Sequence, residues 1–113
     1  MINLDVRRLQ YSVGFEDESL IPAIIQDCTS SEVLSLFYMN LEALKKSLET
    51  GQVWRYSRTH KRVMMKGGES GNTLKIVSVS PDCEYKSLLV KVNPKGPACH
   101  TGEKSCFNKV EYL

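Results

Sequence analysis

The chain has 113 residues, 42% of them apolar and 25% charged, with a formal net charge of +2 at pH 7. This is the composition of one ordinary globular domain, and so small a charge does not point to a nucleic-acid partner. No apolar stretch is long enough to span a bilayer, and residues 1–8 lack the apolar core of a secretory signal. We therefore expect one cytoplasmic domain over residues 1–113, with no membrane partner and with reduced thiols.

The first third of the chain is predicted to be extended. Residues 1–20 are expected to form an extended or frayed N-terminal segment, with an acidic run at 16–18. Buried strands are predicted at 20–25 and 32–39, because both runs are apolar and the second is rich in β-branched and aromatic residues. A polar turn at 29–31 separates them. Cys28, at the end of the apolar stretch 24–28, is expected to be a buried apolar residue.

One helix is predicted over residues 41–50. Asn40 precedes it and suits the N-cap position, because its side chain accepts a hydrogen bond from a free backbone amide. Leu41, Leu44 and Leu48 follow helical spacing and are expected to form one apolar stripe. Gly51 is the expected left-handed stop.

After residue 51 the pattern changes to period two and predicts strands at 52–58, 62–66, 73–80 and 87–92. Strands on both sides of a single helix indicate an α+β fold with a mainly antiparallel sheet. Two features leave alternatives open. The glycine-rich loop 66–72 is either a flexible hairpin turn or a loop whose amides, with Lys66, hold a phosphate. The basic residues between Arg55 and Lys66 form either a solvated strand face or a surface that contacts phosphate.

Three of the four cysteines lie in the last third of the chain: Cys83, Cys99 and Cys106. Zinc prefers thiolate and imidazole ligands, and a catalytic zinc keeps one position open for water. From spacing alone, disulfides, ordinary buried cysteines, and a closed structural zinc site with His100 or Cys28 as fourth ligand remain alternatives.

Specific motifs run from residue 20 to residue 107. They include Leu-Ile-Pro-Ala at 20–23, Tyr-Met-Asn at 38–40, Gly-Pro-Ala-Cys-His-Thr-Gly at 96–102 and Ser-Cys-Phe at 105–107. On these motifs the chain resembles the phosphoribosyl-AMP cyclohydrolases of histidine biosynthesis. The resemblance implies an intertwined α+β homodimer with active sites shared between subunits. It also implies zinc-dependent hydrolysis of the adenine ring of phosphoribosyl-AMP between N1 and C6. This domain is often fused to a pyrophosphohydrolase domain, which we do not expect in residues 1–113.

The resemblance also suggests roles for single residues. Cys83, Cys99 and Cys106 match the zinc thiolates of the family, and His100 matches the histidine proposed for proton transfer. If the backbone is extended there, Cys99 and His100 point in opposite directions, which favours His100 as a general base rather than a fourth ligand. The glycine-rich loop and its charges further predict that the substrate's phosphates and ribose are held by Arg58, Lys66, Ser70 and Asn72.

The chain departs from the family where magnesium is expected. The family usually has an acidic Asp-Cys-Asp-x-Asp run, but residues 82–86 here read Asp-Cys-Glu-Tyr-Lys. Period-two geometry would put residues 82, 84 and 86 on one face. Either Lys86 neutralises Asp82 and Glu84 and little magnesium is needed, or the two acids bind Mg²⁺ with water molecules. Met64 in place of a tryptophan and the order Gly68-Glu69 are further departures.

Two other functions remain as alternatives to the cyclohydrolase. One is a related zinc hydrolase or deaminase that acts on another purine nucleotide. The other is a zinc-stabilised dimer without catalysis.

Overall fold

The computed structural model describes residues 4–15 and 18–113, so part of the acidic run at 16–18 lies outside the described residues. Within those ranges the chain forms one short 3-10 helix, one α-helix and seven strands. In chain order they are η1 (Val6–Arg8), β1 (Val13–Phe15), β2 (Glu18–Asp27), β3 (Val33–Met39), α1 (Leu41–Thr50), β4 (Trp54–Ser57), β5 (Arg62–Met65), β6 (Leu74–Pro81) and β7 (Leu88–Pro94).

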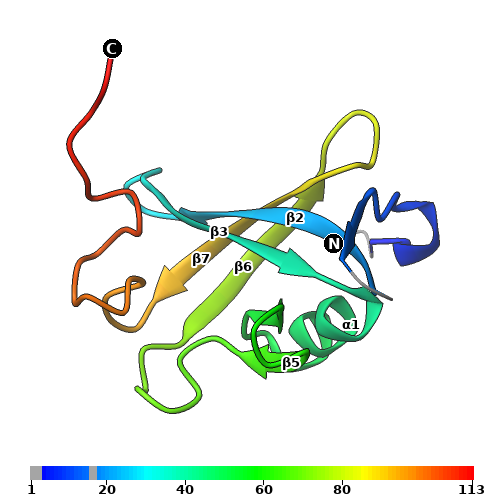
Figure 1. Ribbon diagram of the computed structural model, residues 1–113, viewed down its shortest axis with the longest axis horizontal. Coiled ribbons are helices and arrows are strands. Elements are labelled where there is room, and N and C mark those ends of the chain that lie inside the picture. The colour runs from blue at the N-terminus through cyan, green and yellow to red at the C-terminus, as the bar shows by residue number, and fades with distance from the viewer. Residues whose placement is uncertain (1–3, 16–17) are drawn as a thin grey trace.

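The strands form a five-stranded sheet and a separate β4–β5 hairpin (Figure 1). The sheet has the order β1-β2-β7-β6, and β3 also pairs with β2. The β2–β7 pairing is parallel and the other pairings are antiparallel. The predicted α+β fold with a mainly antiparallel sheet is therefore confirmed. The parallel pair arises because α1 and the β4–β5 hairpin carry the chain away from the sheet after β3, before β6 and β7 return to it.

The helix α1 begins and ends at the residues that the sequence predicted, because its two capping residues act as expected. The Asn40 side chain accepts a hydrogen bond from the backbone N–H of Ala43 at 2.8 Å, and Gly51 ends the helix at φ 72°. The predicted leucine stripe is only partly correct, because Ala43, Leu44 and Ser47 are buried whereas Leu41 and Leu48 are exposed. The reason lies in β4: the Ser47 hydroxyl accepts a hydrogen bond from the N–H of Trp54 at 2.8 Å, which turns that face of α1 toward the hairpin.

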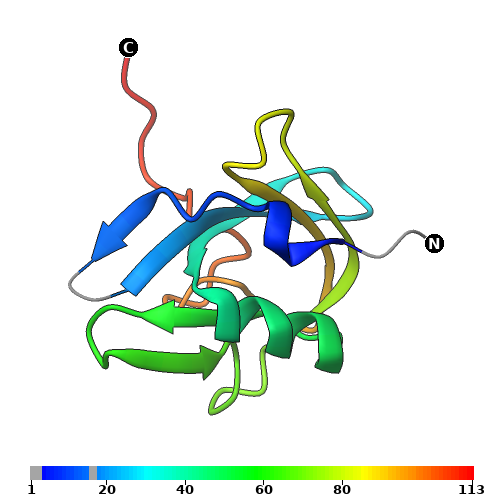
Figure 2. The same cartoon turned by 90° about the vertical axis from the view of Figure 1, so that its right-hand side faces the viewer.

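The core lies between the sheet and a layer made of α1 and the β4–β5 hairpin (Figure 2). Ile21, Ala23 and Ile25 of β2 point into this core and are fully buried. Alternate residues of the same strands face the other way. Ile24 pairs with Leu36 of β3 and with Leu89 of β7, and Ile24 and Leu36 are 37% and 41% exposed. This sheet face thus carries a row of apolar side chains that nothing in the chain covers, among the described residues.

One N-terminal element and one thiol differ from expectation. The segment predicted to be extended or frayed contains the extended strand β1, but also the short helix η1, which was not predicted. Cys28 is exposed rather than buried, because β2 ends at Asp27 and the chain turns there. In the part of the chain that the structure describes, no helix is both long enough and apolar enough to cross a membrane.

Candidate active site

A small loop after β7 carries two of the predicted zinc ligands. The N–H of Gly102 donates to the carbonyl of Cys99 at 3.0 Å, and the N–H of Cys99 donates to the carbonyl of Glu103 at 3.1 Å. Gly102 has a φ of 92°, which closes this tight turn at a conformation that glycine adopts easily. The backbone is therefore bent at Cys99 and His100. The argument that Cys99 and His100 point in opposite directions required an extended backbone, and that condition is not met.

The thiol of Cys99 is nearly buried and accepts hydrogen bonds from two side chains. The residue is 7% exposed, and its Sγ accepts hydrogen bonds from the Thr101 hydroxyl at 3.0 Å and from the Asn108 amide at 3.6 Å. The hydrogen bond from Thr101 is the main cause that lowers the pKa of Cys99 below its ordinary value. Bonds from Asn108 and from the side chain of Cys106 act in the same direction. A lowered pKa favours the thiolate, which is the form that binds metal ions.

Hydrogen bonds to β3 fix the position of the segment that contains Cys106. The N–H of Cys106 donates to the carbonyl of Leu34 at 2.7 Å, and the Ser105 hydroxyl donates to the carbonyl of Val33 at 2.8 Å. These bonds tie residues 105 and 106 to the start of β3. Cys106 is exposed, and its side chain contributes, after those of Thr101 and Asn108, to the lowered pKa of Cys99, which places the two thiols near each other. We call Cys99 and Cys106 the thiol pair.

Lys104 fastens the same loop to the turn between β2 and β3. Its ammonium lies 3.2 Å from a carboxylate oxygen of Asp27 and 3.1 Å from one of Glu32. The Asp27 side chain is only 9% exposed, and its other oxygen accepts the N–H groups of Thr29 and Ser30. Those backbone bonds, and then the bond from Lys104, hold the pKa of Asp27 below its usual range.

Cys83 lies at the opposite end of the sheet from the thiol pair. It sits in the turn between β6 and β7, whereas the thiol pair follows β7 (Figure 1). The seven residues of β7 span roughly 20 Å at about 3.3 Å per residue. Among residues 4–15 and 18–113, no three or more His, Cys, Asp or Glu side chains gather closely enough to hold a metal ion. Within one chain, two of the three predicted zinc thiols come together and the third does not.

The turn that carries Cys83 is built around Asp82, not as a strand. One oxygen of Asp82 accepts the N–H groups of Glu84 at 3.0 Å and Lys86 at 2.9 Å, and the other accepts the Ser87 hydroxyl at 2.6 Å. The predicted period-two arrangement of residues 82–86 is therefore wrong. Glu84 pairs with the Lys86 ammonium at 3.4 Å. Both oxygens of Asp82 accept hydrogen bonds within the turn, so a magnesium ion there would share Asp82 with these donors.

The glycine-rich loop lies beside the thiol-pair loop. A side chain added at Gly96 would collide with the side chain of Asn72, so the Asn72 amide packs directly on the backbone three residues before Cys99. The N–H of Asn72 donates to the Ser70 hydroxyl at 3.2 Å. Three predicted substrate-binding residues, Lys66, Ser70 and Asn72, are thus on a loop that contacts the loop of the predicted zinc ligands. Arg58 lies elsewhere, on the β4–β5 turn.

His100 is exposed at the tip of the thiol-pair loop. It neighbours Cys99 in the chain and lies outside the core, so solvent or a bound molecule can reach it. This placement is compatible with the predicted proton-transfer role.

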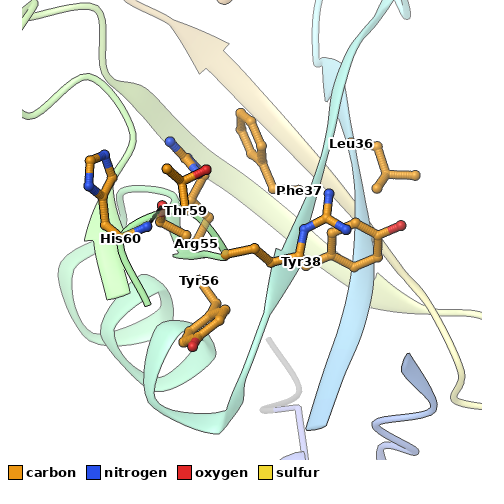
Figure 3. A pocket seen from close by; sticks show the side chains of 9 residues that line it. Leu36, Phe37, Tyr38, Arg55, Tyr56, Thr59 and His60 are labelled. Atoms are coloured by element: carbon orange, nitrogen blue, oxygen red, sulfur yellow. Dashed lines mark hydrogen bonds between the residues drawn. The ribbon is translucent and has the colours of Figure 1, made fainter. Parts of the chain in front are cut away.

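A groove between β3 and the β4–β5 hairpin was not predicted as a unit. It has a volume of about 290 Å³, and Figure 3 shows its lining side chains, with Arg55, Thr59 and His60 on the hairpin and Phe37 and Tyr38 on β3. The sequence held one signal for it, the basic residues between Arg55 and Lys66. The aromatic side of the groove comes from a strand distant in sequence.

The chain is similar in sequence to several curated proteins of histidine biosynthesis. The histidine biosynthesis bifunctional protein HisIE of Campylobacter jejuni is 55% identical over 93 residues, which is 82% of this chain and 45% of that protein. The protein of the same name from Bacillus subtilis is 52% identical over 95 residues, covering 84% of this chain and 46% of its own length. That of Vibrio vulnificus is 55% identical over 105 residues, covering 92% and 50%. The chain spans about half the length of the curated relatives it matches.

The family described as phosphoribosyl-AMP cyclohydrolase matches residues 35–108, a segment that runs from β3 through the thiol pair. This match covers more than half of the chain, and the relatives above are all more than 50% identical to it. The chain therefore belongs to the phosphoribosyl-AMP cyclohydrolase family.

Proposed function

We propose that this chain is a zinc-dependent homodimeric hydrolase that opens the adenine ring of phosphoribosyl-AMP in histidine biosynthesis. Water adds at C6, the N1–C6 bond breaks, and the exocyclic nitrogen stays on the product as part of a carboxamide. The observation that carries the proposal is the thiol pair, in which Cys99 has a lowered pKa and Cys106 lies next to it. Family membership supplies the reaction.

The zinc ligands are proposed to come from two copies of the chain. Cys99 and Cys106 of one copy would hold the ion together with Cys83 of the second, because Cys83 of the same copy is at the far end of β7. The uncovered apolar row that includes Ile24 and Leu36 supports a second copy, since a small domain gains stability by burying such a row. A zinc ion held there would act as a Lewis acid and activate a water molecule.

The chain's own groups supply the remaining steps. His100, exposed beside Cys99, would accept a proton from the attacking water and return one to N1 as the bond breaks. Asn72 and Ser70 would position the ribose, because their loop packs on Gly96 of the thiol-pair loop. Asp82 and Glu84 have no assigned step. Their oxygens are engaged by the turn and by Lys86, which supports little dependence on magnesium.

The experiment is turnover of phosphoribosyl-AMP in zinc-replete buffer, with ring opening followed by absorbance and released ammonia measured in parallel. We expect ring opening without ammonia. Cys106→Ser should lose zinc and activity, whereas Cys28→Ser, which changes another exposed cysteine outside the proposed site, should keep both. Ammonia as the main product would indicate a deaminase instead, and full activity in Cys106→Ser would overturn the ligand assignment.

A further inference from the structure

The turn that carries Cys83 contains a residue in an unfavourable backbone conformation. Tyr85 has a φ of 59°, in the left-handed region that a bulky side chain rarely adopts. Inside the turn, the N–H of Tyr85 donates to the carbonyl of Asp82 at 3.1 Å, and the Asp82 side chain bonds to residues on both sides of Tyr85. A strained residue of this kind persists only where its surroundings hold it. The rest of the hold on Tyr85 comes from outside the turn.

Residues 8–10, which we call the N-terminal strap, contact Tyr85 from the other end of the sequence. The N–H of Gln10 donates to the carbonyl of Tyr85 at 2.7 Å, and the side-chain amide of Gln10 donates to the carbonyl of Glu84 at 3.2 Å. The guanidinium of Arg8 lies 4.2 Å from the ring centre of Tyr85, within cation–π range. Backbone, side chain and preceding carbonyl of the strained residue are thus all held by one segment.

The strap is itself anchored to the domain. Leu9, between Arg8 and Gln10, is 6% exposed and belongs to the core. The helix η1, which ends at Arg8, is capped by the Asp5 side chain, which accepts the N–H of Arg7 at 3.0 Å. Figure 1 shows this segment at the end of the sheet where β6 passes into β7. The strap therefore ties the turn to the body of the domain.

Cys83 lies two residues before Tyr85, so the path of this turn sets the direction of its thiol. The side chain of Cys83 is exposed and can reach a second copy of the chain. Zinc–sulfur bonds are about 2.3 Å long, which leaves a thiolate little freedom of position. If Tyr85 relaxed to a negative φ, the chain on both sides of it would change course and the thiol would move with it.

We propose that the N-terminal strap positions Cys83 for metal binding by holding Tyr85 in its left-handed conformation. Arg8 and Gln10 are positioning residues, because they act through the turn rather than on the metal ion. The inference rests on the proposed function, since it takes Cys83 as a zinc ligand given to the second copy. It adds a role for the segment that precedes β1.

The test measures how tightly the dimer binds Co²⁺, a zinc substitute whose absorption bands report thiolate ligands. The double variant Arg8→Ala with Gln10→Ala, called the strap variant, should bind Co²⁺ about tenfold or more weakly, the usual effect of losing groups that orient a ligand. Arg7→Ala removes the neighbouring arginine, whose side chain is 87% exposed and pairs with Asp5, and should match wild type. Wild-type affinity in the strap variant would overturn the inference.

A third substitution separates positioning from a general loss of structure. Asparagine adopts the left-handed region more easily than tyrosine, so Tyr85→Asn added to the strap variant should restore most of the Co²⁺ affinity. A strap that only stabilised the fold would gain nothing from this change, and an affinity that stays low would refute the role of Tyr85. Gln10→Ala alone, at an exposed residue, serves if the double variant does not fold. It should weaken binding in the same direction, and an unchanged affinity would again overturn the inference.

Cys83→Ser and hydrogen exchange separate this inference from the proposed function. In metal-free protein, the amides of residues 84–86 should exchange faster in the strap variant than in wild type or Arg7→Ala. If Cys83→Ser loses Co²⁺ while the strap variant binds it as wild type does, the strap is wrong and the function stands. If Cys83→Ser binds Co²⁺ as wild type does but the strap variant exchanges faster, the ligand assignment is wrong and the strap still holds the turn.

Discussion

The hydroxyl of Thr101 lies 3.0 Å from the Sγ of Cys99 and donates a hydrogen bond to it. Two residues apart in the chain, they are brought face to face by the turn that Gly102 closes. A hydrogen bond to the charged form of a group stabilises that form, so this contact favours the Cys99 thiolate.

Replacing Thr101 by valine is expected to raise the pKa of Cys99, because the main donor to the thiolate is lost. The thiolate fraction at neutral pH should fall, and with it the rate at which iodoacetamide alkylates Cys99 in metal-free protein. Mass spectrometry of the peptide that contains Cys99 measures this rate separately from the other thiols. Thr101→Ser keeps the hydroxyl and should behave as wild type, and an unchanged rate in Thr101→Val would refute the role.

Replacing Lys104 by methionine is expected to destabilise the folded chain at pH 7, because Asp27 and Glu32 lose their shared cation. The low pKa of Asp27 means that its contribution to stability is present above the ordinary value of 3.8 and is lost as the pH falls below it. The gap between the urea midpoints of wild type and Lys104→Met should therefore narrow in acid. Lys104→Arg is the control, and a gap that stays constant down to acid pH would contradict the ion-pair account.

Gly67→Ala is expected to destabilise the chain more than Gly71→Ala. Both residues have positive φ, 79° and 81°, so each substitution carries a backbone cost of about 1–2 kcal/mol. Only at Gly67 would the new methyl group also collide with the backbone of Asn72 and Thr73, whereas the space at Gly71 is open. Urea denaturation of the two variants provides the comparison. Equal losses of stability would show that the contact at Gly67 relaxes without cost.

His100→Ala is expected to lower kcat by about 10²–10⁴, the usual effect of losing a general acid–base group. Zinc content should not change, because His100 is proposed to move protons rather than to hold the ion. Metal analysis and turnover on the same sample test both statements. If the variant lost its zinc, His100 would be a ligand instead.

Magnesium is expected to matter little. Asp82 accepts three hydrogen bonds in its own turn and Glu84 pairs with Lys86, so a magnesium ion would have to compete with these contacts. Wild type should turn over in zinc-replete, magnesium-free buffer, and Lys86→Asp should gain a dependence on magnesium. Wild type that is inactive until magnesium is added would show that the turn rearranges around the ion.

The parts of the fold that local chemistry determines were predictable from the sequence. Asn40 and Gly51 delimit α1 because a cap and a left-handed stop act over one turn of chain. The turn between β6 and β7 was not predictable in this way. Asp82 accepts hydrogen bonds from three groups within the next five residues, and these bonds override the alternating side-chain directions that the sequence suggests for residues 82–86.

The candidate site was predictable by its residues and not by its geometry. The motif around Cys99 named the thiols, but their distances depend on pairing between segments far apart, such as Cys106 with Leu34. The same applies to the groove, where Arg55 meets Phe37 only after the hairpin folds against β3. The spacing of residues along the chain does not predict contacts between such distant segments.

In the proposed dimer, each zinc site takes Cys83 from one copy of the chain and the thiol pair from the other copy. Subunit mixing tests it most directly. Cys83→Ser and Cys106→Ser should each be inactive alone, but after subunit exchange the mixed dimer contains one complete site. Because half of the dimers are mixed and each has one intact site of two, activity should recover to about a quarter of wild type. No recovery, with exchange verified by mass spectrometry of tagged subunits, would mean that all ligands come from one chain.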